Sequence, residues 1–405
     1  MPRTISGTRT DVSMLRRTDT TRASCGALLA RARRGDSAHF EIVDDAVDGV
    51  VDYVAASMCE CPSRRALHGR MRHFDTGGRR RTEELERRLP TDAEERARVK
   101  IDLVVPSVLL DAGAGPRWRY RDDDAQLARS EGLAVASFRM FMAGAFAADG
   151  ESLRTDAGGL AALDEDSLGR ALQVRDDNPI VGLEGRAHIL TELANALRSD
   201  RDRFGSAGRP GHLFDWAKRQ ARNGKIAATD LLEALLDGLS SIWPGRFEIG
   251  GENIGDVWPH PALGAGVDAL VPFHKLSQWL TLSLIEPMLD GGIEVVGLEG
   301  LTHLPEYRNG GLLIDLGVIS LRDPAERTRA HRVDDTLVVE WRALTVALLD
   351  EIVPRVQARL AAPGDPVALA GFLEAATWLA GRRIAADRRP GGGPPIAIES
   401  DGTVF

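Results

Sequence analysis

Cysteine is scarce in this sequence: only Cys25, Cys59 and Cys61 occur among 405 residues. An odd number of cysteines without framework spacing argues against a disulfide-stapled scaffold and fits a reducing compartment. The closely spaced Cys59 and Cys61 also lack the second paired cluster that a structural zinc site needs. The sequence therefore predicts a fold that depends on neither disulfides nor a zinc cluster.

Long apolar runs are missing as well. No run reaches the roughly 18 apolar residues that a membrane-spanning helix needs. The N-terminal residues are rich in arginine and threonine and lack the apolar segment of a signal peptide. We therefore expect a cytoplasmic protein with no membrane partner.

Positive charge is not in excess, since the net charge is -9 and the pI is about 5.6. Proteins that bind long nucleic acids usually present a basic face, so we expect no nucleic-acid polymer as partner. One mononucleotide-sized anion needs only about two or three cations. Lysine is rare among the 51 basic residues, and Lys275 is one of the few lysines. Each lysine is of interest because an ammonium group can lose its proton where a guanidinium cannot.

A regular alternation of strands and helices is absent, as are internal repeats and long linkers. Apolar residues instead recur at helical spacing, as in Val47–Met58. The segment Ser130–Ala147 is apolar almost all round, which predicts a buried central helix. We predict a mainly α fold with little β structure and no parallel sheet. One large helical domain spans residues 41–405, and residues 1–40 form an arm with one short helix.

Capping signals mark further helices. Thr91 and Glu94 form a capping-box pattern that opens a helix. Asn178 and Pro179 predict an N-cap followed by the first helical position of another. The remaining helices are expected near residues 212–222, 229–243, 272–290, 334–360 and 366–387, with one strand after the Gly/Pro-rich residues 390–395.

Five segments mix charged residues with glycine, proline and aromatic residues, a composition that suits backbone turns beside a ligand. They are Val105–Tyr120, Asn178–Arg186, Gly255–His260, Val271–Leu280 and Leu304–Asp315.

Glu306 is the first candidate for a catalytic group. Pro305 should begin a helix and place Glu306 in its first turn, where the helix dipole favours the ionised carboxylate and a depressed pKa. Such a carboxylate is better suited to stabilise a developing cation, or to orient water, than to donate a proton. Gly310 and Gly311 are costly inside a helix, which suggests that something packs against that backbone. The alternative is a simple helix-end charge paired with Arg308.

Lys275 is the second candidate. Phe273 and Leu276 belong to a core stripe, whereas Lys275 lies off it, between His274 and Trp279. A buried lysine beside aromatic rings has a lowered pKa or serves as a fixed cation. A solvated lysine at a helix edge is the alternative.

Several weaker candidates remain. Trp258 suits ring stacking or ordinary loop anchoring. Glu184 and Arg186 lie at an expected helix start, where an ion pair alone explains them. Asp256 is an alternative to Glu306 as the catalytic carboxylate. We expect Glu184, Trp258, Lys275, Glu306 and Arg308 to share one pocket. The histidines, including His260, His274 and His303, lack His-x3-His and HExxH spacing, so we expect neither a metal nor another cofactor.

Six segments together resemble a known protein family. They are LLDAGAGPRWRY (109–120), SEGLAVASF (130–138), NPIVGLEGR (178–186), GDVWPH (255–260), PFHKLSQWL (272–280) and LPEYRNGGLLIDLGVI (304–319). They resemble the family named for the fourth component of the yeast-type uracil catabolism pathway, from about residue 40 to the C-terminus. The resemblance implies a role in uracil breakdown, with a uracil phosphoribosyltransferase and a cyclohydrolase-like enzyme as pathway partners.

The order of motifs is also similar to that of the queuosine-salvage family, over about residues 105–385. That family hydrolyses the N-glycosidic bond of a nucleoside 5′-phosphate and has a helical fold similar to DNA glycosylases. The similarity implies a DNA-glycosylase-like helical architecture here, with Glu306 and Lys275 as catalytic residues. The family has an aspartate where this sequence has Glu306. The expected substrate-binding residues are Glu184, Arg186, Trp258, His260, Phe273, His274, Tyr307 and Arg308.

These expectations lead to a hypothesis of function. Cleavage of an N-glycoside develops positive charge on the sugar, which a fixed carboxylate stabilises. The preferred reaction is hydrolysis of the N-glycosidic bond of a uracil-derived nucleoside 5′-phosphate, such as a ribosylurea phosphate. One alternative is a ureide or amide hydrolase of the same pathway. The other is a non-enzymatic, nucleotide-binding pathway partner.

Overall fold

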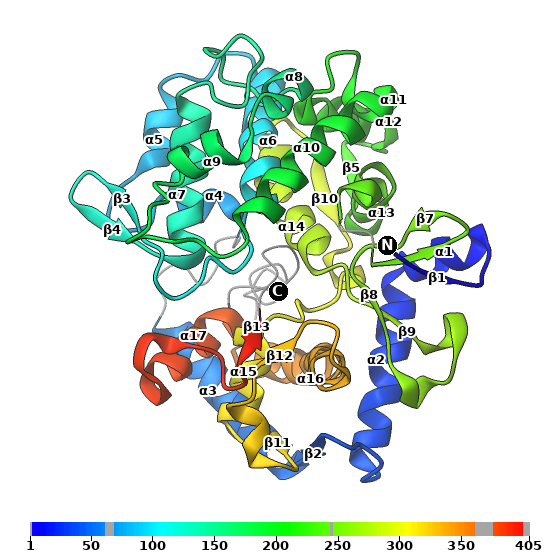
Figure 1. Ribbon diagram of the computed structural model, residues 1–405. Helices are drawn as coiled ribbons and strands as arrows, with labels where there is room; N and C mark the ends of the chain where they lie inside the picture. The colour runs from blue at the N-terminus through cyan, green and yellow to red at the C-terminus, as the bar shows by residue number, and fades with distance from the viewer. Residues whose placement is uncertain (1, 61–68, 244–245, 361–375, 400–405) are drawn as a thin grey trace.

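The computed structural model describes residues 2–60, 69–243, 246–360 and 376–399, and helices dominate them (Figure 1). This confirms the predicted mainly α fold. Cys61 and residues 366–375 of the last predicted helix lie outside the described residues. The helices are α1 (Arg9–Leu15), α2 (Thr18–Arg33), α3 (Val47–Cys59), α4 (Arg70–Phe74), α5 (Arg81–Glu86), α6 (Ala93–Leu109), α7 (Arg129–Met142), α8 (Ala157–Ala161), α9 (Glu165–Ala171), α10 (Leu183–Ser199), α11 (Arg201–Phe204), α12 (Leu213–Gln220), α13 (Ala228–Leu239), α14 (Lys275–Asp290), α15 (Tyr307–Asp315), α16 (Thr336–Leu360) and α17 (Thr377–Arg388).

The strands are short and form small sheets of two or three strands. Contrary to the expectation of no parallel sheet, β1 pairs with β6, β5 with β10 and β12 with β13 in parallel. Each of these parallel pairs joins only two or three residues of each strand. Such short pairs do not need the crossover helices that cover an extended parallel sheet. The strands are β1 (Arg3–Ile5), β2 (Phe40–Ile42), β3 (Tyr120–Asp122), β4 (Ala125–Leu127), β5 (Lys225–Ala227), β6 (Phe247–Ile249), β7 (Glu252–Asn253), β8 (Val257–Pro259), β9 (Leu270–Pro272), β10 (Glu294–Val296), β11 (Ile319–Leu321), β12 (His331–Arg332) and β13 (Ile398–Glu399).

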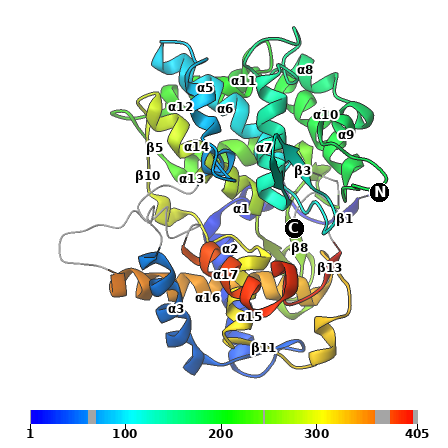
Figure 2. The ribbon, with the colours of Figure 1, turned by 90° about the vertical axis from the view of Figure 1, so that its left-hand side faces the viewer.

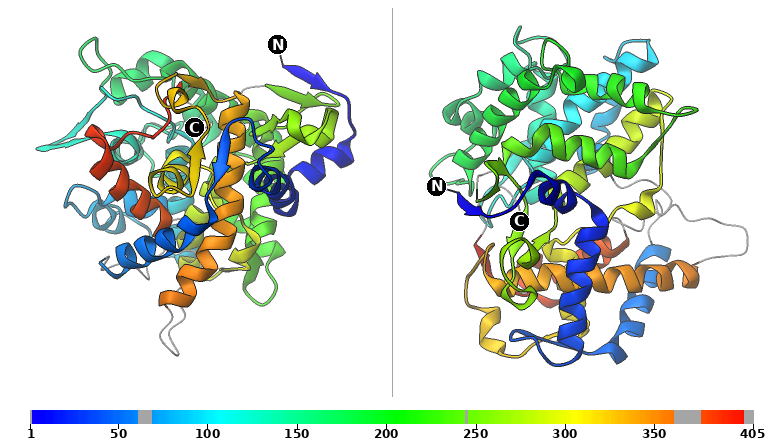
Figure 3. Two further views of the ribbon diagram at one scale, coloured as in Figure 1. Left: turned by 90° about the horizontal axis from the view of Figure 1, so that it is seen from below. Right: turned by 90° about the vertical axis from the view of Figure 1, so that its right-hand side faces the viewer.

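Two groups of helices lie one above the other in Figures 1 and 2, and the right-hand view of Figure 3 keeps the same division. In the upper group α14 packs on α6, and α10 packs on α8. In the lower group α16 packs against α2 and α3, and α15 packs against α17. The C-terminal strand β13 lies between the two groups in Figure 1. Segments far apart in the sequence therefore meet where the groups adjoin.

The N-terminal residues differ from the expected arm with one short helix. They contain strand β1 and two helices, α1 and α2. Arg22 of α2 donates from Nε to Asp350 Oδ2 at 3.0 Å and from Nη1 to the Gly300 carbonyl at 3.2 Å. Helix α2 packs against α16, and its apolar residue Leu28 is buried. These residues thus contribute to the common core, because α2 offers its own apolar stripe to α16.

The predicted central helix is α7, and its apolar residues are buried as expected. It ends at Met142, five residues before the predicted Ala147. The chain turns at Gly144, which has a φ of 76°. A Cβ atom there would lie 2.5 Å from the Gly150 carbonyl oxygen, so only glycine fits this turn.

Two predicted helix starts need correction. The side chain of Asp92, not Thr91, caps α6 and accepts a hydrogen bond from Glu95 N at 2.7 Å. Helix α10 begins at Leu183, several residues after Pro179. Asn178 instead ties down a loop, because its Oδ1 accepts from Arg119 N at 2.8 Å and its Nδ2 donates to the Arg119 carbonyl at 2.8 Å. A side chain that forms hydrogen bonds with distant backbone groups is not available to cap a helix.

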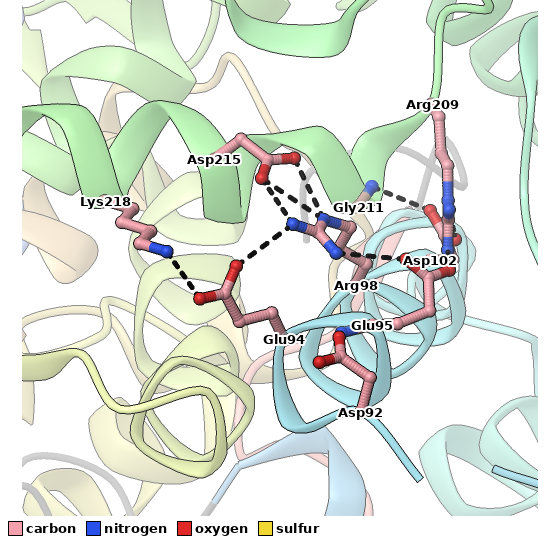
Figure 4. A network of polar contacts seen from close by, with 9 residues as sticks. All are labelled: Asp92, Glu94, Glu95, Arg98, Asp102, Arg209, Gly211, Asp215 and Lys218. Carbon is pink, nitrogen blue, oxygen red and sulfur yellow. Dashed lines mark hydrogen bonds and ion pairs between the residues drawn. The ribbon is translucent and has the colours of Figure 1, made fainter. Parts of the chain in front are cut away.

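A polar network fixes the middle of α6 (Figure 4). Asp102 Oδ2 accepts from Arg209 Nε at 2.6 Å, and its Oδ1 accepts from Gly211 N at 2.7 Å. Arg98 Nε donates to Asp215 Oδ2 at 3.0 Å. Burial raises the pKa of Asp102 to about 7, even though Arg209 opposes the shift. The network anchors the helix whose last residue, Leu109, leads directly to Asp111.

The Gly310→Ala substitution is expected to destabilise the fold by about 1–3 kcal/mol. A Cβ atom at Gly310 would lie 2.6 Å from Trp341 Nε1 and 2.7 Å from Thr345 Oγ1, so α15 and α16 would have to separate. This contact confirms the prediction that something packs against the glycine pair. Chemical denaturation measures the loss, and unchanged stability would contradict the close helix contact.

Gly49→Ala is the matched control for this substitution. Gly49 lies inside α3, and a Cβ atom added there would have no neighbouring atom within 4 Å outside its own helix backbone. Alanine favours a helix interior over glycine by about 1 kcal/mol, so this variant should be neutral or more stable.

Candidate functional site

A cavity of about 330 Å³ opens where the two groups of helices adjoin. Both groups contribute to it: α4, α7, α14 and the loop after α6 come from one group, and α15 and α17 come from the other. Its polar and aromatic lining residues are His73, Asp111, Arg129, Ser130, Lys275, Trp279, Glu306, Tyr307, Arg308 and Trp378. Pockets of this size accommodate small ligands.

The C-terminal segment forms one wall of the cavity through Gly393, Pro394 and Ile398. Arg129, at the start of α7, donates to the Gly391 carbonyl at 2.5 Å and to the Gly392 carbonyl at 3.0 Å. The predicted strand near the C-terminus is present as β13, which pairs with β12. The wall is therefore joined to both groups of helices.

Lys275 is placed by the hairpin of β8 and β9, in which Trp258 lies opposite Val271. His274 has a φ of 49° and turns the chain into α14. Asp256, just before β8, accepts the backbone N–H of Lys275 through Oδ2 at 3.0 Å. The two motifs GDVWPH and PFHK are thus one structural unit that begins α14 at the cavity.

Asp256 is a structural acid in this unit, and it does not line the cavity. Its carboxylate accepts two hydrogen bonds from Arg342, both at 2.8 Å, and one from Trp258 Nε1 at 2.6 Å. Burial alone would raise the pKa of Asp256, but Arg342 and the hydrogen bonds from Trp258 and Lys275 hold it well below its usual range. Arg342 Nε also donates to the Pro305 carbonyl at 3.2 Å, next to Glu306. One buried ion pair therefore connects the Lys275 and Glu306 segments.

Lys275 is partly buried and lines the cavity. Burial lowers the pKa of Lys275, while the negative charges of Glu306, Asp111 and Asp256 oppose the shift. The direction agrees with the expected lowering of the Lys275 pKa and disagrees with a fully solvated lysine.

Glu306 is the N-cap of α15, one position before the expected first turn. Its Oε2 accepts from Arg308 N at 2.9 Å and its Oε1 from Asn309 N at 2.5 Å. The expected lowering of its pKa is wrong: burial raises the pKa of Glu306, although these N–H groups and the charges of Arg308 and Lys275 oppose the shift. The helix terminus acts as predicted, but the loss of water around the carboxylate outweighs it.

Aromatic rings and a cation form another side of the cavity. The Arg308 guanidinium lies 5.3 Å from the centre of the Tyr307 ring and 5.0 Å from that of Trp378. The His73 ring lies 5.6 Å from Trp279 and 5.8 Å from Trp378, measured between centroids. Such a surface suits contact with a planar ligand group beside an anion.

Asp111, Ser130 and His73 form a polar cluster at the cavity, and the sequence did not identify Asp111 or Ser130 as site residues. Asp111 Oδ2 accepts from Arg70 Nη1 at 2.8 Å and from Ser130 Oγ at 2.7 Å. Ser130 Oγ also lies 3.3 Å from His73 Nδ1. One feature of the sequence could have identified Asp111: it begins an Asp-Ala-Gly-Ala-Gly turn directly after a long apolar helix. A carboxylate is uncommon at the C-terminal end of a helix.

Arg186, Phe273 and His274 are buried away from the cavity. Arg186 donates to the carbonyls of Leu110 at 3.1 Å and Ala112 at 2.6 Å, and so holds the loop that carries Asp111. The Arg342 guanidinium lies over the Phe273 ring at 4.1 Å. His274 Nε2 makes a hydrogen bond with the Leu15 carbonyl at 2.9 Å. These three side chains pack against other groups of the protein and do not line the cavity.

The expectation that five residues share one pocket holds for Lys275, Glu306 and Arg308 only. Glu184 is exposed on the first turn of α10, and Trp258 is buried beside Asp256. His260 lies near Glu340, with 3.7 Å between Nε2 and Oε2, in a different pocket. Helix α10 starts later than predicted, and Glu184 in its first turn does not line the cavity.

The histidines considered for a metal have different partners: His303 lies near Asp350, His260 near Glu340, and His274 at the Leu15 carbonyl. Across residues 2–60, 69–243, 246–360 and 376–399, no three His, Cys, Asp or Glu side chains gather in a way that would hold a metal ion. Over the same residues, no helix has the length and apolar character to cross a membrane.

Comparison with known proteins gives one family and two curated relatives. The family model described as "Protein of unknown function (DUF1688)" matches residues 14–405. Protein urg3 of Schizosaccharomyces pombe is 40% identical over 368 residues, which cover 89% of this chain and 90% of the relative. Uracil catabolism protein 4 of Lachancea kluyveri is 38% identical over 411 residues, covering 92% of this chain and 93% of the relative. These matches confirm the resemblance to the uracil-catabolism family.

Proposed function

The chain belongs to the family described as "Protein of unknown function (DUF1688)", and we propose that it acts in uracil catabolism. We propose further that it hydrolyses the N-glycosidic bond of a uracil-derived nucleoside 5′-phosphate, such as a ribosylurea 5′-phosphate. The observation that supports this reaction most is that Glu306 and Lys275 line the same cavity, together with aromatic rings. The proposed products are ribose 5-phosphate and the free urea or ureide.

The proposed chemistry divides the work among three residues. As the C–N bond breaks, positive charge develops on the ribose, and the Glu306 carboxylate stabilises it. The Lys275 ammonium donates a proton to the departing nitrogen, a role that a lowered pKa favours. Arg308 supplies a cation for the 5′-phosphate. Water provides the hydroxyl group on the sugar.

Product analysis by mass spectrometry tests the reaction. Purified protein is incubated separately with ribosylurea 5′-phosphate, uridine monophosphate and the matching nucleosides. Ribose 5-phosphate from a phosphorylated substrate is the expected product. Release of ammonia or a carboxylate would favour the ureide or amide hydrolase instead, and binding without turnover would favour a nucleotide-binding pathway partner.

Two further expectations belong with this proposal. The DNA-glycosylase-like architecture is consistent with the helical fold and stays a prediction. The proposed pathway partners are a uracil phosphoribosyltransferase, which would supply the nucleotide, and a cyclohydrolase-like enzyme, which would open its ring.

The pH dependence of kcat/KM should be a narrow bell. Activity needs Glu306 ionised and Lys275 protonated, and burial moves their pKa values toward each other. The acid limb should therefore lie above the ordinary glutamate pKa of about 4.3, and the alkaline limb below the ordinary lysine pKa of about 10.4. Initial rates measured in well-buffered solutions across this pH range locate both limbs. An acid limb at or below the ordinary value would contradict the role of Glu306.

A further inference from the structure

We propose that Asp111 is a second catalytic carboxylate, the general base that takes a proton from the attacking water. This proposal rests on the proposed hydrolysis and assigns its missing base. Glu306 and Asp111 are the two carboxylates among the described residues that line the cavity. They come from different groups of helices, Glu306 from α15 and Asp111 from the loop after α6.

The bonding of Asp111 leaves one oxygen for a ligand. Both protein hydrogen bonds to its side chain, from Arg70 and Ser130, reach Oδ2. Within the described part of the chain no hydrogen bond reaches Oδ1. The Asp111 side chain is 12% exposed, whereas that of its partner Arg70 is 0% exposed. Oδ2 is therefore the anchored atom and Oδ1 the atom that water can reach.

Arg70 acts behind Asp111 and does not face the ligand. Its Nε donates to Ser107 Oγ at 2.7 Å and its Nη2 to the Ser107 carbonyl at 2.9 Å. A guanidinium fixed in this way holds the Asp111 carboxylate in place by a charge-assisted hydrogen bond. An anchored carboxylate can act as a general base on a water molecule beside it.

Ser130 connects Asp111 to His73. Since Ser130 donates its hydroxyl proton to Asp111, the 3.3 Å contact between Ser130 Oγ and His73 Nδ1 requires a proton on Nδ1. Ser130 is thus a positioning residue, because its hydroxyl proton is held by the anchored oxygen Oδ2 of Asp111.

Glu306, Asp111 and Lys275 each have a separate role in the proposed reaction. The negative charges of Glu306 and Asp111 both act on Lys275. Water attacks C1′ of the ribose as the C–N bond breaks, and its proton passes to Asp111 Oδ1. The departing nitrogen receives the proton of Lys275, and solvent then carries the Asp111 proton back to Lys275. The net reaction consumes one water and needs no other reactant.

The experiment compares Asp111→Asn with the parent protein on ribosylurea 5′-phosphate. Asp111→Asn should lower kcat by about 10²-fold with a much smaller change in KM, because the base acts after binding. Azide, an anion that attacks without a general base, should restore turnover of Asp111→Asn and give a ribosyl azide 5-phosphate detectable by mass spectrometry. Asp176→Asn, which alters an exposed aspartate, is the matched control and should match the parent.

The outcomes separate this proposal from the proposed function. If the parent releases ribose 5-phosphate and a folded Asp111→Asn does so at the same rate, Asp111 is not the base and the hydrolysis stands. If the parent releases none, the proposed function falls and this role falls with it. If Asp111→Asn does not fold, Asp111→Glu keeps a charge for Arg70 but displaces the base by a methylene. A loss of about 10- to 10²-fold in kcat is then expected, and parental turnover would overturn the proposal.

Discussion

Glu306→Gln is expected to lower kcat by about 10²–10³-fold, the usual effect of removing one preorganised electrostatic group. The substitution keeps the shape of the side chain and removes its charge. KM should change far less, because the charge is needed only after the C–N bond begins to break. Steady-state kinetics on ribosylurea 5′-phosphate would measure both constants.

The same variant also weakens a helix cap, and the two effects can be separated. The Glu306 oxygens accept the N–H groups of Arg308 and Asn309, whereas a glutamine offers only one oxygen. We therefore expect a stability loss of about 0.5–2 kcal/mol, small enough to leave the protein folded. Melting curves recorded alongside the kinetics measure this loss of stability.

Glu306→Asp provides the charge-retaining control. Aspartate is a good N-cap, so stability should be retained, while the carboxylate retreats by one methylene and kcat should fall to an intermediate value. Normal turnover by a folded Glu306→Gln would show that Glu306 is only a cap. Loss of turnover that follows loss of folding would lead to the same conclusion.

The helices could be predicted from the sequence because their signal is local. The repeat in Val47–Met58 and the apolar length of Ser130–Ala147 record which faces are buried. In the structure the first segment and residues 130–142 of the second are helical, and their apolar residues are buried. Their ends were harder to place. Asn178 is a good N-cap residue, but its side chain bonds the backbone of Arg119, 59 residues away. Local capping rules do not include such long-range competition.

The site was predicted in part for a related reason. Lys275 and Glu306 stand out through unusual neighbours in the sequence, and the structure places both at one cavity. The direction of the Glu306 pKa shift depends on burial by distant helices, which a local helix-terminus argument omits. Asp111 was missed because its partners Arg70 and Ser130 meet it only in the folded chain.

Arg342→Met is expected to destabilise the protein by about 3–5 kcal/mol, because it leaves the Asp256 carboxylate buried without its cation. Both residues are buried and joined by two hydrogen bonds of 2.8 Å. The pKa of Asp256 in the folded protein lies below its unfolded value of about 3.9. The contribution of the pair is therefore complete at neutral pH and is lost as the pH falls through the folded pKa. Denaturant unfolding at neutral pH measures the loss.

Two comparisons show whether the loss belongs to this ion pair. Arg359→Met changes another arginine of α16, whose partner Asp52 is exposed, and should have little effect. The double variant Arg342→Met with Asp256→Asn removes both charges, so it should cost less than the sum of the two single variants. Additive losses would mean that the two charges do not stabilise each other. The Lys275 and Glu306 segments would then be held together by packing alone.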